Sequence, residues 1–305
     1  MDKIIAIVGP TGVGKTALSI ALAKELNGEI ISCDSMQVYK KMDIGTAKVT
    51  ENEKEGIIHY LVDDQTYDEP YNVKIFQEKC RYYIHKIIEK GKTPILCGGT
   101  GLYLKAALYD YTFEEEHVDE EYLKKLEQKS NEELFGLLQT IDEKTAKTIH
   151  INNRKRLIRA LQIAHSGEIK SEREAKQQHK PLYDIYFVGL DAPRPILHER
   201  INQRVEKMFK EGLVQEVESL FSEPETWEYT SFQGIGYKEF KEYFENKMTL
   251  VQVKEKIKTH SRQYAKRQIT WFKNQMPVHW YSIENKKGII QEVKDWYYGK
   301  YETKK

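Results

Sequence analysis

The chain has 305 residues, of which 40% are hydrophobic and 31% are charged, and its formal net charge is +1. This composition excludes a disordered or fibrous protein, and the length suffices for two domains or for one large α/β domain with an insertion. The near-zero net charge argues against a surface coated in positive charge, although binding depends on where the charges lie.

The three cysteines and the apolar runs indicate the compartment. Cys33, Cys80 and Cys97 form no CxxC pair, which argues against a zinc site or a disulfide framework and favours a reducing environment. The apolar run near the N-terminus is too short for a signal peptide or a membrane span, and no later run approaches eighteen residues. We therefore expect a cytoplasmic protein that does not contact a membrane.

The first hundred residues alternate between strand-like and helix-like patterns. Strands are expected at Lys3–Val8, Glu29–Cys33 and Thr93–Cys97, and helices at Thr16–Leu26 and Tyr71–Glu89. The strands are short apolar runs and the helices repeat apolar residues with helical spacing. Alternation of this kind predicts an α/β fold with a parallel sheet covered by helices.

The pattern changes near residue 114 and changes back near residue 184. Helices are expected at Val118–Lys129, Asn131–Leu138 and Arg154–Ala164, followed by a polar, loop-like stretch at Glu168–Pro181. We therefore predict an α/β core of residues 1–113 and 184–305 with an all-helical insertion of residues 114–183. In the rest of the core we expect strands at Asp184–Leu190 and Val278–Ser282, and helices at Ile196–Phe221 (interrupted at Gly212), Tyr237–Phe244 and Thr249–Phe272.

A phosphate-binding motif follows the first predicted strand. It matches the pattern GxxxxGK[ST] and consists of Gly9, Pro10, Thr11, Gly12, Val13, Gly14, Lys15 and Thr16. Glycines let backbone N–H groups turn toward an anion, and the following helix adds a partial positive charge at its N-terminus. Lys15 supplies a full positive charge, and the Thr16 hydroxyl is the expected Mg²⁺ ligand. A diphosphate ester fits such a loop as well as a nucleoside triphosphate.

The residues after the other strands do not indicate a GTPase or a motor ATPase. No NKxD motif is present, and the strand Thr93–Cys97 ends in glycines rather than in a carboxylate. A carboxylate, Asp34, instead follows the second strand, at the edge of the sheet where open α/β folds place their sites. A turn or helix-capping role for Asp34 remains an alternative.

Several longer segments together resemble the tRNA dimethylallyltransferase (tRNA isopentenyltransferase) family of bacterial type. The match extends from Ile5 to about Trp280, and no C-terminal zinc-finger extension follows. The segments are Asp34-Ser-Met-Gln-Val-Tyr39, Met42-Asp-Ile-Gly-Thr-Ala-Lys48, Gly98-Gly-Thr-Gly-Leu-Tyr103, Ile235-Gly-Tyr-Lys238 and Gln263-Tyr-Ala-Lys-Arg-Gln-Ile-Thr-Trp-Phe272.

The resemblance implies a fold, a reaction and a cofactor. The core would be similar to P-loop kinases and NTPases but would hydrolyse no nucleotide, and Mg²⁺ would be the cofactor. The reaction would transfer a dimethylallyl group from dimethylallyl diphosphate to N6 of the adenosine 3′ of the anticodon (tRNA position 37), in tRNAs that read codons beginning with U. Two departures leave details of substrate contact open: only one histidine at His59-Tyr60, and Asn152-Asn153 where the family often has DPQR.

The reaction assigns candidate catalytic roles. Diphosphate leaves, so preorganised donors must stabilise negative charge on the bridging oxygen. The resemblance implies that Thr100 reaches that oxygen and that Arg204 clamps the diphosphate; without it, Arg204 would be interpreted as a surface residue. The adenine amine is a weak nucleophile, so a general base would accelerate its attack by about 10²–10⁴-fold, and Asp34 is our candidate.

The acceptor is expected to be the anticodon stem–loop of tRNA, with its target base flipped out of the stack. Asp34, Ser35, Met36 and Gln37 would face the flipped adenine. The other predicted RNA contacts are Lys155, Arg156, Leu157, Ile158, Arg159, Gln233, Gly234, Ile235, Gly236, Tyr237, Lys238, Arg262, Lys266 and Arg267. Each of these could equally belong to a solvated helix face. We expect the enzyme to act as a monomer.

The charge distribution supports an RNA partner better than the total does. Residues 114–143 carry net charge −8, whereas residues 150–180 carry +5 and residues 247–274 carry +7. Binding that depends on salt concentration is therefore expected. Three alternatives remain: a P-loop nucleotide kinase, an enzyme that prenylates free AMP or ADP, and a non-enzymatic RNA-binding P-loop module.

Overall fold

The computed structural model describes residues 1–113 and 119–300 and divides the chain into two compact units. The first unit comprises residues 1–109 and 181–305, and the second residues 110–180. The divisions fall four and three residues before the boundaries expected from the sequence, because Tyr109 and Pro181 form a β-bridge that keeps both in the first unit.

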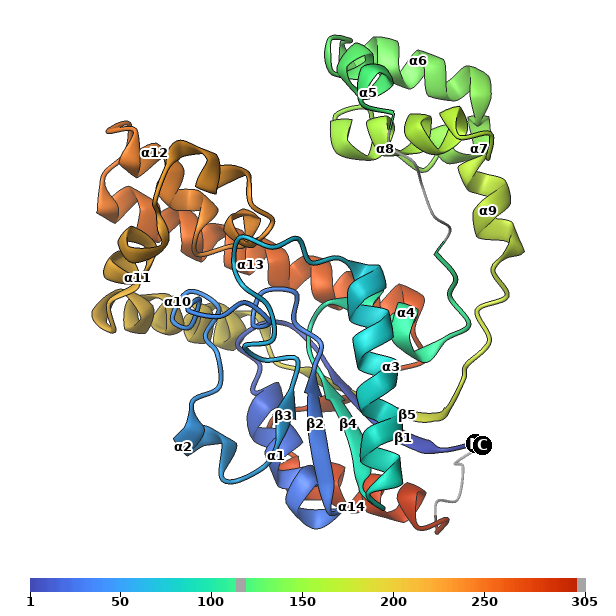
Figure 1. Ribbon diagram of the computed structural model, residues 1–305. Helices are drawn as coiled ribbons and strands as arrows, with labels where there is room; N and C mark the ends of the chain where they lie inside the picture. Colours follow the sequence, from blue (N-terminus) through green and yellow to red (C-terminus); the bar gives the residue numbers. More distant parts are fainter. Residues whose placement is uncertain (114–118, 301–305) are drawn as a thin grey trace. The chain divides into compact units, whose positions relative to one another are not determined.

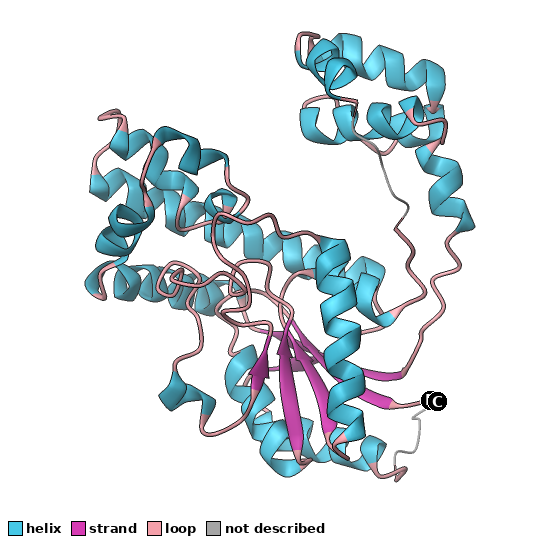
Figure 2. Ribbon diagram, viewed as in Figure 1, coloured by secondary structure: helices cyan, strands magenta, loops and turns pink. Residues whose placement is uncertain are grey.

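The first unit is built on a six-stranded sheet whose strand order is β3-β2-β4-β1-β5-β6 (Figures 1 and 2). All neighbouring strands are parallel, which confirms the predicted α/β fold. The strands are β1 (Lys3–Val8), β2 (Gly28–Ser32), β3 (His59–Tyr60), β4 (Thr93–Cys97), β5 (Asp184–Asp191) and β6 (His279–Ser282).

Helices cover both faces of this sheet, which explains why its four inner strands, β2, β4, β1 and β5, are buried without alternation. Along β1, Ile4 and Ala6 belong to one buried cluster and Ile5 and Ile7 to the other. The helices against these clusters are α1 (Lys15–Glu25) and α14 (Lys286–Tyr297) on one face, and α3 (Val73–Glu89) and α4 (Gly101–Leu108) on the other.

A helical layer of the first unit lies beyond the carboxyl ends of β1, β2 and β4. It contains two long helices that pack together, α10 (Arg194–Lys210) and α13 (Leu250–Gln275). Gly212 has φ +102° and separates α10 from α11 (Leu213–Leu220), as the sequence predicted. The remaining short elements are α2 (Glu51–Lys54), η1 (Pro224–Glu228), η2 (Ser231–Gln233), η3 (Lys238–Phe240) and α12 (Lys241–Phe244).

The second unit consists of helices around its own core, which includes Leu126, Leu134, Leu138, Leu157 and Leu161. The helices are α5 (Glu120–Glu127), α6 (Asn131–Ile141), α7 (Glu143–Ala146), α8 (Arg154–His165) and α9 (Lys170–Lys176). The predicted start of the first of these at Val118 lies outside the described residues.

The loop predicted for Glu168–Pro181 is wrong in part, because this stretch contains helix α9. Its first turn is stabilised by Asp142, whose Oδ2 accepts a hydrogen bond from the Ser171 N–H at 2.9 Å, while Oδ1 caps α7 at Thr145 N. These hydrogen bonds lower the pKa of Asp142 to about 2 despite its burial. The cap lies 29 residues from the helix it supports, so a local sequence pattern does not show it.

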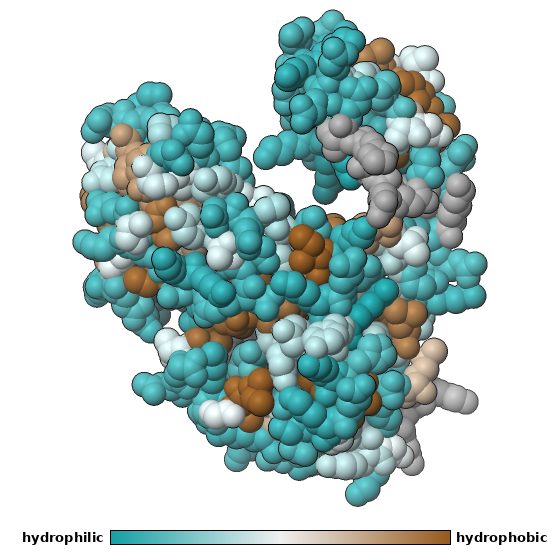
Figure 3. All heavy atoms as spheres, in the orientation of Figure 1, coloured by the Kyte–Doolittle hydropathy of each residue, from teal (hydrophilic) through white to brown (hydrophobic). Residues whose placement is uncertain are grey.

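The surface in view is mostly polar, with small scattered apolar groups on both units (Figure 3). Within the described parts of the chain, no helix has the length and apolar character that a bilayer crossing requires.

Candidate active site

The loop between β1 and α1 has the backbone that its glycines predicted. Gly9, Gly12 and Gly14 adopt φ values of +140°, +79° and +98°, which L side chains rarely tolerate. A Cβ at Gly9 would also lie 2.6 Å from the Leu190 carbonyl oxygen of β5. Gly14 precedes the first residue of α1, so the helix N-terminus points to the loop.

Lys15 lies across this loop. Its Nζ donates to the carbonyl oxygens of Gly9 at 3.0 Å and Pro10 at 2.8 Å. Burial lowers the pKa of Lys15 to about 8, and the nearby Arg204 charge also lowers it, while Cys97 and Asp34 act in the opposite direction. Burial thus outweighs the nearby groups that favour the charged ammonium form.

A cavity of about 270 Å³ opens at the loop, and we call it the phosphate cavity. It is polar and contains the lysine, the Thr16 hydroxyl and backbone of the loop. Its lining residues are Thr11, Gly12, Gly14, Lys15, Thr16, Asp34, Gln37, Ala47, Cys97, Gly98, Arg204, Tyr264 and Gln268.

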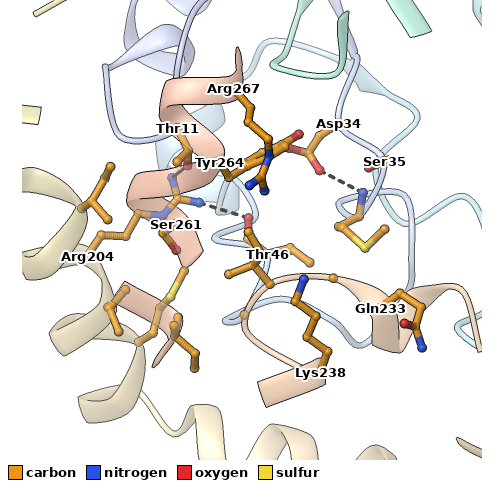
Figure 4. Close-up of a pocket in the computed structure, with 18 residues that line it drawn as sticks. Thr11, Asp34, Ser35, Thr46, Arg204, Gln233, Lys238, Ser261, Tyr264 and Arg267 are labelled. Atoms are coloured by element: carbon orange, nitrogen blue, oxygen red, sulfur yellow. Dashed lines mark hydrogen bonds between the residues drawn. The ribbon is translucent and has the colours of Figure 1, made fainter. Parts of the chain in front are cut away.

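A second cavity, also of about 270 Å³, adjoins the first (Figure 4). We call it the adjoining cavity. Four residues line both cavities and so mark their junction: Thr11, Asp34, Arg204 and Tyr264. The other lining residues are Ser35, Met36, Gly45, Thr46, Ile201, Val205, Met208, Gln233, Gly234, Ile235, Lys238, Ile257, Ser261 and Arg267.

Arg204 on α10 points into the junction rather than to solvent. Its Nη1 donates to Thr11 Oγ1 and its Nη2 to the Thr46 carbonyl oxygen, both at 3.2 Å (Figure 4). Burial lowers the pKa of the guanidinium, and the Asp34 carboxylate opposes this effect. The surface alternative for Arg204 is therefore wrong, because the residue lines both cavities and its guanidinium is hydrogen-bonded to Thr11 and Thr46.

Asp34 is held at the junction by the turn that follows β2. Its Oδ1 accepts hydrogen bonds from the backbone N–H groups of Met36 at 2.9 Å and Gln37 at 3.4 Å. The turn fixes the carboxylate. Asp34 therefore has the turn role that was the alternative interpretation, and it also lines both cavities.

Thr100 does not line either cavity. It precedes α4, and its Oγ1 is buried without a hydrogen bond among the described residues. It neighbours Tyr264: burial raises the pKa of Tyr264 to about 12, Asp34 adds to the rise, and Thr100 and Gln268 oppose it. In this structure the Tyr264 side chain, not Thr100, borders the cavities.

Three of the four predicted adenine-facing residues meet in one place with several of the other predicted RNA contacts. Ser35, Met36, Gln233, Gly234, Ile235 and Lys238 line the adjoining cavity together with Asp34. Gln37 instead lines the phosphate cavity, and its Nε2 donates to the carbonyl oxygens of Thr46 and Ala47.

Two of the predicted RNA contacts have buried side chains. Tyr237 is fully buried and donates its hydroxyl to Glu216 Oε1 at 2.7 Å. Leu157 is fully buried in the core of the second unit. Both side chains face inward and contribute to packing, although the motifs that contain them are largely polar. Gly236 lies beside Tyr237, with φ +102° and its N–H donated to Glu239 Oε2 at 2.8 Å.

The predicted basic residues lie on two helices. On α13, Arg267 lines the adjoining cavity and stacks over the Tyr264 ring, Lys266 is exposed, and Arg262 donates to Asn202 Oδ1 at 2.6 Å. On α8, in the second unit, Lys155, Arg156 and Arg159 are exposed and Ile158 is half-buried.

Residues without a predicted role also shape the site. Gln268 accepts from Thr11 N at 2.9 Å and donates to the Gly99 carbonyl oxygen at 3.0 Å, so it fixes the phosphate loop to the glycines after β4. Tyr264 and Gln268 both belong to the Gln263–Phe272 segment that carried the resemblance, which was the available signal. Thr46 contributes a backbone carbonyl, which side-chain patterns do not show.

The residues present fit Mg²⁺ bound with a phosphate rather than a metal held by protein alone. The Thr16 hydroxyl and the Asp34 carboxylate share the phosphate cavity. In the described residues, no group of three or more His, Cys, Asp or Glu side chains could hold a metal. Mg²⁺ characteristically takes one or two protein ligands and completes its shell with phosphate oxygens and water.

Fold and site together define a phosphate-binding α/β enzyme with a second cavity next to its P-loop. The family model described as IPP transferase matches residues 37–275. A tRNA dimethylallyltransferase from Enterococcus faecalis is 48% identical, with 97% of this chain and 98% of the relative covered. A tRNA dimethylallyltransferase from Bacillus anthracis is 48% identical, with 92% and 91% covered.

Solved structures agree with these relatives. The tRNA isopentenylpyrophosphate transferase of Staphylococcus epidermidis is 43% identical, with TM-score 0.73 and 98% of this chain and 99% of that chain covered. A eukaryotic dimethylallyltransferase acting on tRNA is 31% identical, with TM-score 0.86 and 100% and 81% covered. The chain therefore belongs to the tRNA dimethylallyltransferase family of IPP transferases, and it is a prenyl-transferring enzyme.

Proposed function

We propose that the protein transfers the dimethylallyl group of dimethylallyl diphosphate to N6 of the adenosine at tRNA position 37, giving N6-isopentenyladenosine and diphosphate. The observation that carries this proposal is the junction of the two cavities. A polar cavity at a P-loop suits the diphosphate, the adjoining cavity suits the flipped base, and the group to be transferred must pass between them.

Asp34 is the proposed general base. In the reaction the C1–oxygen bond of the allylic diphosphate breaks while a bond forms between C1 and N6, and N6 loses a proton. Asp34 lies where the two cavities meet and is oriented by the Met36 N–H. A carboxylate at that position accepts the proton and passes it to solvent.

The leaving diphosphate is the proposed ligand of Lys15, Arg204 and the loop backbone. Their donors are fixed before substrate arrives, which is the arrangement that stabilises charge developing on a leaving oxygen. Mg²⁺ on Thr16, when bound, supplies further positive charge to the diphosphate. Thr100 stays a candidate for the bridging oxygen, since its buried Oγ1 lies beside Tyr264, which lines the phosphate cavity.

The anticodon stem–loop is the proposed acceptor. The adjoining cavity presents the backbone and side chains of residues 233–235 together with Lys238 and Arg267, which suit a base and its flanking phosphates. The exposed basic residues of α8 and α13 are proposed to contact the RNA backbone. A tRNA substrate and three free cysteines suit a cytoplasmic enzyme, and the monomeric state stays a prediction.

The test measures transfer and separates the alternatives. Labelled dimethylallyl diphosphate is incubated with tRNA, with AMP or without acceptor, and the nucleosides are analysed. We expect N6-isopentenyladenosine from tRNA only. Label on AMP but not on tRNA would overturn the proposed acceptor, and ATP-dependent phosphorylation without prenyl transfer would overturn the reaction.

Asp34 is tested in the same assay. Asp34→Asn keeps an oxygen that can cap the turn but removes the base, so turnover should fall by at least about 10²-fold while tRNA affinity changes little. Asp68→Asn, at an exposed carboxylate outside both cavities, is the matched control. Wild-type single-turnover rates for Asp34→Asn would rule out the base.

A further inference from the structure

Glu216 makes an unusual set of contacts although it lines neither cavity. It lies on α11, and its two carboxylate oxygens accept four hydrogen bonds. Oε2 accepts from the N–H groups of Asp43 at 2.8 Å and Ile44 at 2.7 Å, and Oε1 accepts from Gly45 N at 3.0 Å and from the Tyr237 hydroxyl at 2.7 Å. Three consecutive backbone donors thus converge on one carboxylate.

These contacts order a segment without regular secondary structure, residues 42–48, which we call the 42–48 loop. The N–H groups of residues 43–45 belong to no helix or strand, and the Glu216 side chain satisfies them instead. Lys48 fixes the far end of the loop, because its Nζ donates to the Tyr39 carbonyl oxygen at 2.7 Å and to Asp63 Oδ1 at 2.6 Å, and it also donates to Asp43 Oδ1 at 2.5 Å. Glu216 thus holds the backbone N–H groups of residues 43–45, while Gln37 Nε2 donates to the carbonyl oxygens of Thr46 and Ala47.

That part of the loop leads directly to the junction. Thr46 follows Gly45, and its carbonyl oxygen accepts from Arg204 Nη2 at 3.2 Å. Gly45 and Thr46 line the adjoining cavity and Ala47 the phosphate cavity. Since Thr11 and Thr46 together hold the guanidinium, a displacement of Thr46 removes one of the two contacts that orient Arg204.

Close packing makes the arrangement rigid. A Cβ at Gly45 would lie 2.5 Å from the Tyr237 ring, and a Cβ at Gly236 would lie 3.0 Å from the Gly45 carbonyl oxygen. The Tyr237 hydroxyl ends on the same Glu216 oxygen as Gly45 N. Glu216 thereby joins the 42–48 loop to the segment containing Gly234 and Lys238, which also lines the adjoining cavity.

We propose that Glu216 is a positioning residue for Arg204: it fixes the 42–48 loop so that the Thr46 carbonyl holds the guanidinium toward the diphosphate. The expected effect on kcat/KM rests on the proposed function. The expected effect on the affinity for inorganic diphosphate does not. Loss of Glu216 should resemble a partial loss of Arg204, whereas a merely structural role would lower stability and leave the diphosphate site unchanged in the folded protein.

The variants are Glu216→Ala, Glu216→Gln and the matched control Glu218→Ala. Glu218 is exposed on the same helix, so its replacement removes the same charge without touching the loop. Glutamine has one acceptor oxygen and therefore breaks at least one pair of the four hydrogen bonds while it preserves side-chain size. Calorimetry with inorganic diphosphate measures the affinity, and circular dichroism verifies folding.

In folded Glu216→Ala we expect the affinity for inorganic diphosphate and kcat/KM for dimethylallyl diphosphate to fall by about 10- to 100-fold. Glu216→Gln should show a smaller loss and Glu218→Ala none. The double variant Glu216→Ala/Arg204→Ala should bind diphosphate no more weakly than Arg204→Ala alone, because both changes remove the same interaction.

Wild-type diphosphate affinity in folded Glu216→Ala, or losses that add fully to those of Arg204→Ala, would overturn the inference. If Glu216→Ala does not fold, the same two criteria apply to Glu216→Gln. Failure of the proposed function is distinguishable, since wild-type protein would then bind diphosphate and respond to the Glu216 variants while transferring no prenyl group to tRNA.

Discussion

Arg204 Nη1 donates a hydrogen bond to Thr11 Oγ1 at 3.2 Å, which joins helix α10 to the phosphate loop across 193 positions of sequence. The contact places a partly buried guanidinium at the point where the phosphate cavity meets the adjoining cavity. Arginine retains its charge in such a place because its pKa in water is far above neutrality. A fixed cation at that point can act on a leaving diphosphate without rearrangement.

Replacement of Arg204 by alanine should therefore reduce kcat/KM for dimethylallyl diphosphate by at least about 10²-fold. Arg204→Lys should recover only part of the loss, because an ammonium lacks the planar guanidinium that contacts Thr11 and Thr46 from two separate nitrogens. Steady-state kinetics with varied diphosphate substrate measure both. Arg200→Ala, at an exposed position of the same helix, is the control, and an equal loss there would show that charge on α10 rather than the junction matters.

Lys15 makes diphosphate binding dependent on pH. Its pKa in the free protein is lowered to about 8, so above that pH the free protein increasingly carries a neutral amine. A bound anion favours the ammonium form and raises the pKa again. Diphosphate binding at pH 8.5 should thus take up protons, and affinity should decline as the pH rises through about 8.

Calorimetry in two buffers of different ionisation enthalpy measures this proton uptake. Inorganic diphosphate itself titrates in this range, so Lys15→Met provides the baseline. The uptake assigned to the lysine is the difference between the two proteins. Identical uptake by wild type and Lys15→Met would contradict the lowered pKa.

Two glycine substitutions should change stability in opposite directions. A Cβ at Gly98 would lie 2.4 Å from the Cys33 carbonyl oxygen, a backbone atom, and the two residues directly follow the adjacent strands β4 and β2. Gly98→Ala should therefore destabilise the first unit by about 1–3 kcal/mol. Gly136 is exposed within α6 and a Cβ there meets nothing within 4 Å, so Gly136→Ala should stabilise the second unit by about 0.5–1 kcal/mol.

Chemical denaturation of each variant, with hydrogen exchange to assign the transition to its unit, measures both changes. Unchanged stability of Gly98→Ala would mean that β2 and β4 can separate locally without cost. Lower stability of Gly136→Ala would mean that the exposed face of α6 is not free.

The sequence predicted the elements that are specified by residues close together in the chain. The run from Lys3 to Val8 and the glycine pattern from Gly9 to Gly14 specify a strand and a loop whose outlines are confirmed by the structure. Asp34 could be placed at the sheet edge because parallel strands end together. The motif Gln263–Phe272 also pointed to the site, although its Tyr264 was given no role beforehand.

What the sequence did not predict depends on distant partners. Glu216 is one of many acidic helix residues, and only the fold brings it to the backbone N–H groups of residues 43–45. Tyr237 lies in a motif expected to contact RNA, but its phenol is buried on that same carboxylate. Helix α14 was missed, although it packs against α1 and β5 of the first unit.

The basic residues of α8 provide a prediction for the second unit. Lys155 and Arg156 are exposed, whereas Arg154 is committed to the carbonyl oxygens of Glu127 and Lys129, both at 2.7 Å. Lys155→Ala/Arg156→Ala should therefore remove RNA-directed charge without affecting the fold of the unit. If a side chain binds a phosphate, its removal should lower the slope of log affinity against log salt concentration by about 0.7–0.9, and this applies to each of the two.

Filter binding of tRNA between low and moderate salt measures the slope, and kcat at saturating tRNA should be unchanged. Lys144→Ala/Lys147→Ala removes the same charge from exposed lysines around α7 in the same unit, and an equal change of slope there would mean that the positions of Lys155 and Arg156 on α8 have no special part in RNA binding.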